Sequence, residues 1–293
     1  MLVLVAVSLL WAFSFGLIKT SLAGIDPHFV AFLRLFLSFL AFLPFLRLRN
    51  LPRSLALRLF LTGMVQYGVM YIAYLSAFRF LKSYEVAIFT IFTPLYVTLI
   101  HNALTRKVYR LYMITTLLTV LGTGIVQGFT PLRSDMLNGF FLVQISNLCF
   151  AAGQVYYRHV MSAHPGLKDH HIFGLLYLGA FLTPALSFLL FGNWQATSLS
   201  LPQTLTVLYL GIISSGLAFF LWNYGARRVN PGALAIFNDL KIPLAVAVSL
   251  LIFGESANWV SLSIGGGIVL VALFINELGR KAQLNAALSN PAE

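Results

Sequence analysis

Long apolar stretches separated by short polar connections run along the chain from its first residue to about residue 277. An apolar stretch of about 18 or more residues with few charges is typical of a membrane-spanning helix. The short alternating segments of a membrane β-barrel are absent from the sequence. The pattern therefore predicts an all-α polytopic membrane protein with ten spanning helices, at residues 2–22, 29–46, 57–78, 85–104, 111–128, 138–158, 172–192, 204–224, 232–254 and 259–277.

Lysine and arginine residues gather on one side of this predicted bundle. Most of them lie in the connections after the second, fourth, sixth and eighth spans and in the C-terminal tail. Because cytoplasmic connections are enriched in Lys and Arg, this asymmetry predicts that both termini are cytoplasmic. It also accounts for the net charge of +11, which would suggest a nucleic-acid partner in a soluble protein, so no nucleic acid is expected.

The two halves of the chain resemble each other, and each half holds five of the predicted spans. Because five is odd, the second half enters the membrane in the opposite sense to the first. Inverted repeats of this kind are typical of secondary transporters, in which the substrate site lies near the midplane where the halves meet. Three short matches recur in order: Ala87-Ile88-Phe89 with Ala235-Ile236-Phe237, Pro94 with Pro243, and residues 122–126 with residues 265–269.

The chain resembles the EamA branch of the drug/metabolite transporter superfamily. Besides the five-plus-five pattern and the two prolines, the matching features are Trp11-Ala12 in the first span, Arg34 in the second, and Gly254-Glu255 before a glycine-rich last helix. The sequence departs from the family at residues 104–107, "LTRK", where a Gly-Glu ending is expected, and at residues 238–241, "NDLK".

This resemblance implies a first five-helix EamA-like repeat over residues 1–136, a second over residues 137–277 and a cytoplasmic tail over residues 278–293. It also implies a multi-pass protein of the bacterial inner membrane. Members of the family export amino acids, nucleosides, drugs and other metabolites on one scaffold, so the resemblance defines the fold better than the substrate.

The most unusual polar group lies in the ninth span, where Asn238, Asp239 and Lys241 interrupt an apolar run. A charged side chain near the centre of a span costs about 2.5–3.5 kcal/mol on insertion scales and normally faces a cavity or a partner. Pro243 is expected to open the helix locally, because its ring clashes with the carbonyl of Asp239. Two interpretations follow: a structural ion pair, or a transport site in which Lys241 holds a substrate carboxylate or phosphate and Asp239 binds a proton or an amine.

Other candidate substrate-binding residues are polar or aromatic side chains within spans. Arg34 is close enough to the end of its span to extend to the interface as an anchor, or it contacts the substrate. Tyr67, Tyr71 and Tyr74 follow each other at steps of four and three and so share a helix face. With Trp11 and Tyr157 they form either an aromatic wall for an amphiphilic substrate or ordinary packing.

Three amides, Asn147, Gln154 and Asn223, either hydrogen-bond between helices or line the pathway. The four histidines around the connection after the sixth span lack the spacing of metal ligands, so no metal is expected. No P-loop, dinucleotide-binding glycine pattern or HExxH motif occurs, so no cofactor or ATP-driven step is expected. Gly265, Gly266 and Gly267 allow close helix packing, against the same chain or in a homodimer.

These features predict an inner-membrane secondary transporter that exports amino acids or related small carboxylated metabolites by alternating access. The expected partners are a small-molecule substrate, the lipid bilayer and, as a candidate driving force, protons. The alternative within transport is an exporter of apolar drugs or nucleosides. The alternatives from other classes are an intramembrane lipid-modifying enzyme, which usually carries its carboxylates or histidines at one membrane face, and a non-transporting scaffold, which has no need of a midplane lysine.

Overall fold

The structure is a computed structural model that describes residues 1–22, 24–49, 51–81, 86, 89–127, 136–252 and 259–289. All regular secondary structure in these ranges is helical. Ala87, Ile88 and Gly254-Glu255, on which part of the repeat and of the family resemblance depend, lie outside the described residues.

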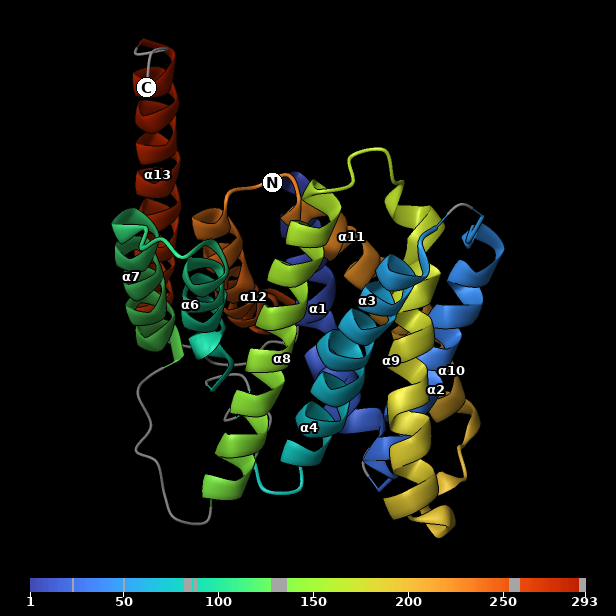
Figure 1. Ribbon diagram of the computed structural model, residues 1–293. Coiled ribbons are helices and arrows are strands. Elements are labelled where there is room, and N and C mark those ends of the chain that lie inside the picture. Colours follow the sequence, from blue (N-terminus) through green and yellow to red (C-terminus); the bar gives the residue numbers. More distant parts are fainter. Residues whose placement is uncertain are drawn as a thin grey trace.

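The helices form one bundle in which the N-terminus and the C-terminal end of α13 lie at the same end (Figure 1). The α-helices are α1 Leu2–Ser21, α2 Pro27–Phe42, α3 Arg53–Gly63, α4 Met70–Ala77, α6 Thr93–Thr105, α7 Arg110–Gln127, α8 Leu137–Ser162, α9 Asp169–Phe191, α10 Leu201–Tyr209, α11 Ala218–Ala226, α12 Pro231–Ile252 and α13 Trp259–Ser289. Short 3-10 helices are η1 Leu43–Phe45, η3 Thr90–Phe92 and η5 Trp194–Thr197.

By length and composition, six helical stretches can cross a membrane: Pro27–Phe45, Arg53–Ala77, Leu137–Ser162, Asp169–Phe191, Leu201–Ala226 and Trp259–Gly279. Shorter apolar helices at Leu2–Ala12 and Arg110–Ile125 accompany them. These stretches confirm an all-helical membrane protein within the part of the chain that the structure describes, and they agree in position with the spans predicted from the apolar pattern.

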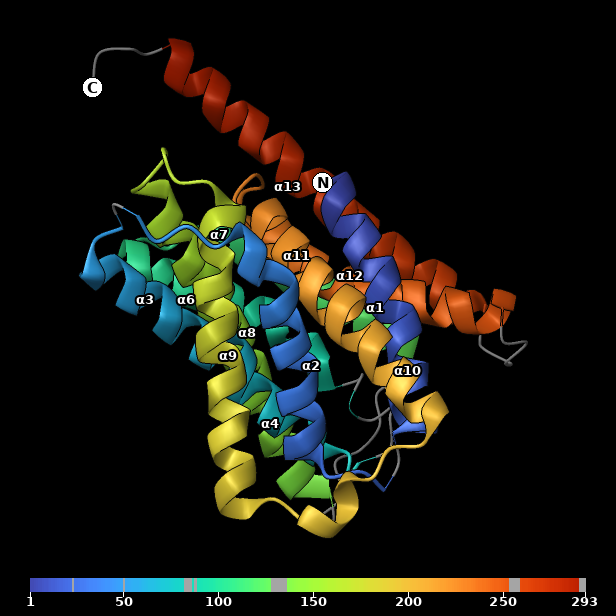
Figure 2. The same cartoon turned by 90° about the vertical axis from the view of Figure 1, so that its right-hand side faces the viewer.

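Wide π-helical turns interrupt the third helix of each half. Segment η2, Met64–Val69, joins α3 to α4, and segment η6, Leu210–Leu217, joins α10 to α11. A π-helical turn changes the angular spacing of the side chains that follow it, and such turns are frequent at functional sites. Helix α2 lies between α9 and the α10–η6 segment (Figure 2), which places its buried face against η6.

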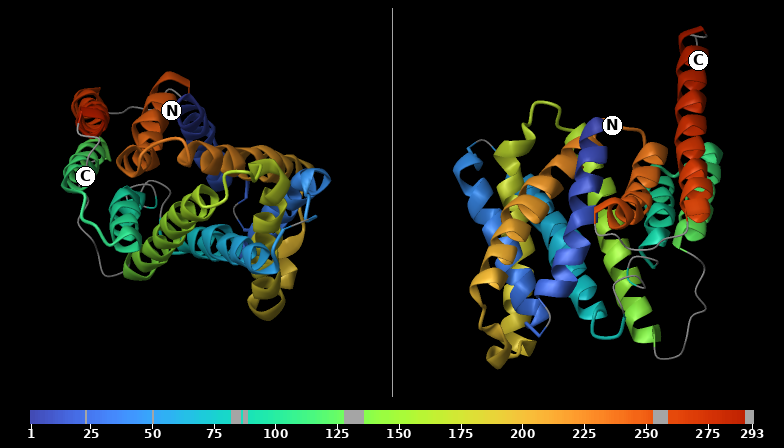
Figure 3. Two further views of the ribbon diagram at one scale, coloured as in Figure 1. Left: turned by 45° about the horizontal axis from the view of Figure 1, so that its top comes forward. Right: turned by 180° about the vertical axis from the view of Figure 1, so that it is seen from behind.

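Helix α13 lies at the edge of the bundle beside α7 (Figures 1 and 3). A Cβ atom added to Gly122 of α7 would lie 2.7 Å from the carbonyl oxygen of Gly265, so the two backbones approach closely there. Gly265 of the glycine-rich segment therefore packs within the same chain. A Cβ atom added to Gly267 would meet nothing within 4 Å among the described residues.

Helix α12 continues through Pro243 to Ile252. The local opening expected at this proline is therefore not present, and the charged residues before it lie on a regular helix. A proline in a helix removes one hydrogen bond and displaces one carbonyl. The nearest neighbour of a Cβ atom added to Gly266 would be the Pro243 ring, at 3.9 Å, so a glycine of α13 faces the proline.

Candidate functional site

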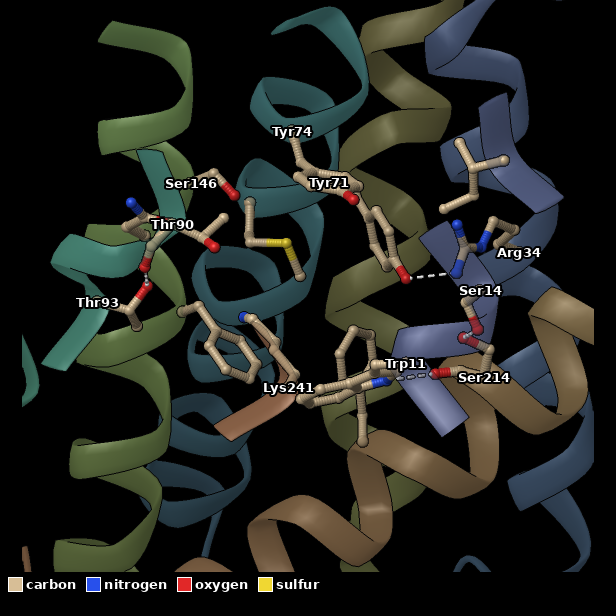
Figure 4. A pocket seen from close by; sticks show the side chains of 15 residues that line it. Trp11, Ser14, Arg34, Tyr71, Tyr74, Thr90, Thr93, Ser146, Ser214 and Lys241 are labelled. Carbon is tan, nitrogen blue, oxygen red and sulfur yellow. Dashed lines mark hydrogen bonds between the residues drawn. The ribbon is translucent and has the colours of Figure 1, made fainter. Parts of the chain in front are cut away.

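A pocket lies inside the bundle where helices from both halves of the chain meet (Figure 4). Its apolar and aromatic wall consists of Trp11, Ile18, Met70, Tyr71, Tyr74, Phe150 and Phe219. Its uncharged polar groups belong to Ser14, Thr90, Thr93, Ser146, Asn147 and Ser214. The two charged lining residues, Arg34 and Lys241, are both cations, so an anionic group is the complementary ligand.

Arg34 on α2 is buried, with an exposed fraction of only 1%, so it does not extend to the membrane surface as an anchor would. Its Nη2 atom donates to the hydroxyl of Tyr71 at 2.7 Å and to Ser215 Oγ at 3.0 Å, and its Nε donates to Ser215 Oγ at 3.2 Å. Its Nη1 atom has no hydrogen-bond partner among the described residues. These bonds hold the guanidinium in place at the pocket wall.

Trp11 on α1 forms the wall between the two cations (Figure 4). Its indole Nε1 donates to the carbonyl oxygen of Ser214 at 3.0 Å, and a Ser14–Ser214 hydroxyl contact of 2.8 Å lies beside it. The Trp11 ring packs edge-on against Phe150 and Phe219, with centroids 5.9 Å and 5.4 Å away. These contacts fix the indole plane against the pocket.

Lys241 on α12 enters the pocket from the second half of the chain, with its Nζ atom 5.9 Å from the centroid of the Trp11 ring. Asp239, two residues earlier, is fully buried outside the pocket lining. Its Oδ2 atom accepts a hydrogen bond of 3.1 Å from Thr123 Oγ1 on α7. The two charged residues form no ion pair within 4.0 Å, so the structural pair considered from the sequence is at most an interaction at longer range.

Asn147 on α8 lines the pocket at the point where the chain passes from η3 into α6. Its Nδ2 atom donates to the carbonyl oxygen of Phe89 at 2.8 Å and to Gln144 Oε1 at 3.3 Å. Both amide hydrogens are thereby used, which leaves Oδ1 as an acceptor.

The other three amide candidates bond between helices and lie outside the pocket lining. Gln154 and Asn238 exchange hydrogen bonds of 3.2 Å and 3.3 Å, and Trp222 Nε1 donates to Gln154 Oε1 at 2.8 Å. Asn223 and Gln66 form a second reciprocal amide pair, at 2.8 Å and 3.1 Å. Buried amides whose hydrogen bonds are satisfied fix the packing of the helices that carry them. Gln154, Asn223 and Asn238 therefore join α8, α11 and α12 to their neighbours.

Of the three tyrosines, Tyr71 and Tyr74 line the pocket and Tyr67 does not. Tyr67 lies in the π-helical segment η2 and stacks on Phe219, with centroids 4.5 Å apart. It supports the aromatic wall from behind.

Sequence reasoning missed the hydroxyl residues of the site. Ser214 and Ser215 lie in the π-helical segment η6, and serines in an apolar run carry no distinctive signal. Thr90 and Thr93 also lie in an apolar run. Arg34, a basic residue within a span, was the available signal for this region, because Ser215 bonds to it.

The described residues contain no group of three or more His, Cys, Asp or Glu side chains that could hold a metal ion. The pocket offers cations, hydroxyls, an amide and aromatic rings. This is the chemistry of recognition rather than of bond cleavage.

Comparison with known proteins identifies the family. The EamA-like transporter family matches residues 1–127 and 137–277. The biotin transporter of Salmonella typhimurium is 36% identical over 278 residues, which cover 94% of this chain and 92% of that protein. The biotin transporter of Escherichia coli is 36% identical over 279 residues, with the same coverage of each chain.

A probable biotin transporter of Pseudomonas aeruginosa is 35% identical over 280 residues, which cover 95% of this chain and 98% of that protein. A crystal structure of another protein, 19% identical, superposes with a TM-score of 0.75 over 94% of this chain and 96% of that chain, which supports the fold. These findings confirm the resemblance drawn from the sequence. The chain therefore belongs to the EamA-like transporter family and is a multi-pass transporter of the bacterial inner membrane.

Proposed function

We propose that this protein transports biotin by alternating access, and that the pocket between Trp11, Arg34 and Lys241 is its substrate site. The observation that carries the proposal is the buried Arg34, which has no described partner for Nη1 and lines a pocket to which the described residues contribute no acidic side chain. A guanidinium binds a carboxylate through parallel N–H donors. The names of the relatives supply biotin as the carboxylate.

The remaining wall suits the rest of that molecule. Biotin joins its carboxylate through an apolar chain to a sulfur-containing ring fused to a ureido group. Trp11, Phe150 and Phe219 offer an apolar surface for the chain and the ring. Asn147 Oδ1 and the threonines of the η3–α6 junction offer acceptors and donors to a ureido group.

Amino acids, the substrate class first predicted, fit this pocket less well. An amino acid carries an α-ammonium group beside its carboxylate, and a buried ammonium requires an acidic partner. No Asp or Glu lines the pocket in the part of the chain that the structure describes. Apolar drugs or nucleosides would leave the buried Arg34 without a counter-charge.

The proposed architecture remains ten spanning helices as two inverted five-helix repeats over residues 1–136 and 137–277, with a cytoplasmic tail over residues 278–293. Two observations support it. The N-terminus and the C-terminal end of α13 lie at one end of the bundle (Figure 1), and the third helix of each half carries a π-helical segment. Inverted halves that meet at a central pocket provide the geometry for alternating access.

The test is uptake of radiolabelled biotin into liposomes that contain the purified protein, with and without a pH gradient. Unlabelled biotin should compete, and biotinamide, which lacks the carboxylate charge, should compete at least tenfold less well. Alanine and leucine serve as the amino-acid arm. Uptake of the amino acids but not of biotin, or equal competition by biotinamide, would contradict the proposal.

A further inference from the structure

Three charged side chains lie in or beside the pocket, and two of them, Arg34 and Asp239, are buried. Arg34 and Lys241 line it, and Asp239 lies fully buried on α12, two residues before Lys241. Asp239 accepts one hydrogen bond, from Thr123 at 3.1 Å, and its Oδ1 atom has no partner among the described residues. A carboxylate in this position needs a positive charge near it, because one neutral donor does not replace its hydration.

Lys241 is the charged group that interacts electrostatically with Asp239, and the interaction is mutual. Four other titratable side chains on the helices packed against α12 contact residues elsewhere. Tyr96 of α6 bonds to Gln144, His101 of α6 packs against Tyr109, Tyr112 of α7 stacks on Tyr109, and Glu277 of α13 bonds to Asn230. Asp239 and Lys241 therefore compensate each other, although they are not in contact.

Arg34 has no such compensation. Within the described part of the chain its polar partners are the hydroxyls of Tyr71 and Ser215, which carry no charge. The ion pairs Arg79–Asp26 and Arg227–Asp169, formed by described side chains, involve other residues. The described residues in and beside the pocket therefore contribute two positive charges and one negative charge, a net single positive charge.

We propose that Asp239 sets the charge of the substrate without touching it. By compensating Lys241 it leaves one positive charge, that of Arg34, for the ligand, and the site therefore selects a monoanion over a neutral molecule or a dianion. Charges in a low-dielectric interior interact strongly over several ångströms, so the balance matters even without contact. This inference rests on the proposed substrate site and adds a specificity-determining residue outside it.

The test changes the charge balance in steps. In Lys241→Gln the remaining Arg34 and Asp239 cancel, in Asp239→Asn two positive charges remain, and in the double variant the single positive charge is restored. Purified protein in detergent is titrated calorimetrically with biotin and with octanoate, octanamide and octanedioate, which carry one, zero and two negative charges. The octanoate series measures charge preference independently of biotin, so a failure of biotin as the substrate is distinguishable from a failure of this inference.

For the wild type, octanoate should bind at least tenfold more tightly than octanamide or octanedioate. Lys241→Gln should weaken octanoate at least tenfold and leave octanamide within threefold. Asp239→Asn should strengthen octanedioate at least tenfold. The double variant should recover octanoate binding to within threefold of the wild type. This result is decisive, because if Lys241 itself held the carboxylate, removing Asp239 as well would not restore binding.

Thr123→Val is the matched control, since it removes the hydrogen bond to Asp239 and keeps every charge; its preference for octanoate should be unchanged. Two results would overturn the inference: an Asp239→Asn variant with the wild-type charge preference, or a double variant no better than Lys241→Gln. If Asp239→Asn does not fold, Lys241→Gln alone decides, because retained octanoate preference in that variant contradicts the charge balance.

Discussion

Replacing Arg34 by methionine should abolish tight binding of the carboxylated substrate while leaving the empty protein intact. The guanidinium is almost fully buried at the pocket wall, and its Nη1 atom has no hydrogen-bond partner among the described residues. Removing one partner of a buried, hydrogen-bonded charge pair costs about 2–5 kcal/mol of binding free energy. At about 1.4 kcal/mol per tenfold change, the dissociation constant should rise roughly 30- to 4,000-fold.

The stability of the empty protein should change in the opposite sense to its affinity. Arg34 carries an uncompensated buried charge before substrate binds, and replacing such a charge by an apolar side chain is often neutral or stabilising. Its two partners remain satisfied, because the Tyr71 hydroxyl lies 3.1 Å from Ser215 Oγ and can bond to it. Thermal unfolding of the ligand-free variant should therefore occur at or above the wild-type temperature.

The assay is calorimetric titration of purified protein with biotin, beside thermal unfolding without ligand. Arg228→Met is the matched control, because Arg228 is exposed and lies over the Tyr224 ring, 3.3 Å from its centroid. Arg34→Lys retains the charge but loses the two-pronged geometry, so its affinity should be intermediate. Wild-type affinity in Arg34→Met, or a loss that matches a loss of folding, would refute the reasoning.

Three further outcomes test the packing around the site, each measured as the free energy of unfolding in detergent. Gln66→Leu should lower the free energy of unfolding by about 1–3 kcal/mol because it leaves the buried Asn223 amide without a partner. Adding Asn223→Leu should recover part of that loss. If the two substitutions instead lower stability by the sum of their separate effects, the amides do not form a reciprocal pair. Asp169→Asn should cost about 3 kcal/mol because it breaks the partly buried ion pair with Arg227 at 2.6 Å, and an unchanged stability would count against it. Gly122→Leu should destabilise the protein because a Cβ atom there has no room against α13, whereas a neutral effect would mean that the helices separate freely.

The helical architecture followed directly from the sequence, because apolar stretches long enough to cross a bilayer have few alternatives to a helix. Several site residues followed as well. Lysine and arginine within apolar runs are costly unless they face a cavity or a partner, and both Arg34 and Lys241 line the pocket. The cost of burying a charge in a bilayer thus predicts that Arg34 and Lys241 face a cavity or a partner, but it does not identify the partner of either residue.

The sequence could not separate the amides that hold helices together from the one at the pocket. Asn147 and Gln154 lie seven residues apart on α8, about two turns, and so on nearly the same face. One bonds at the η3–α6 junction and the other to Asn238 on α12. Their roles differ because different helices pack against α8 at Asn147 and at Gln154, and this packing belongs to the tertiary structure, which the sequence pattern does not show.

The π-helical segments could not be predicted from the sequence either, and one of them, η6, contributes Ser215 to the surroundings of Arg34. Ser215 lies in η6, and its hydroxyl accepts hydrogen bonds from the guanidinium. Periodicity arguments assume a regular helix, so they fail where the turn widens. The expected opening at Pro243 failed for the opposite reason, because the tertiary packing keeps α12 helical there.

The central claim is that the carboxylate of biotin binds to Arg34 in the pocket, and a structure of the protein with biotin bound tests it most directly. The account predicts a carboxylate oxygen within hydrogen-bond distance of Arg34 Nη1, with the apolar chain of biotin against Trp11 and its ureido group near Asn147. A carboxylate on Lys241 alone, or biotin bound outside this pocket, would contradict it.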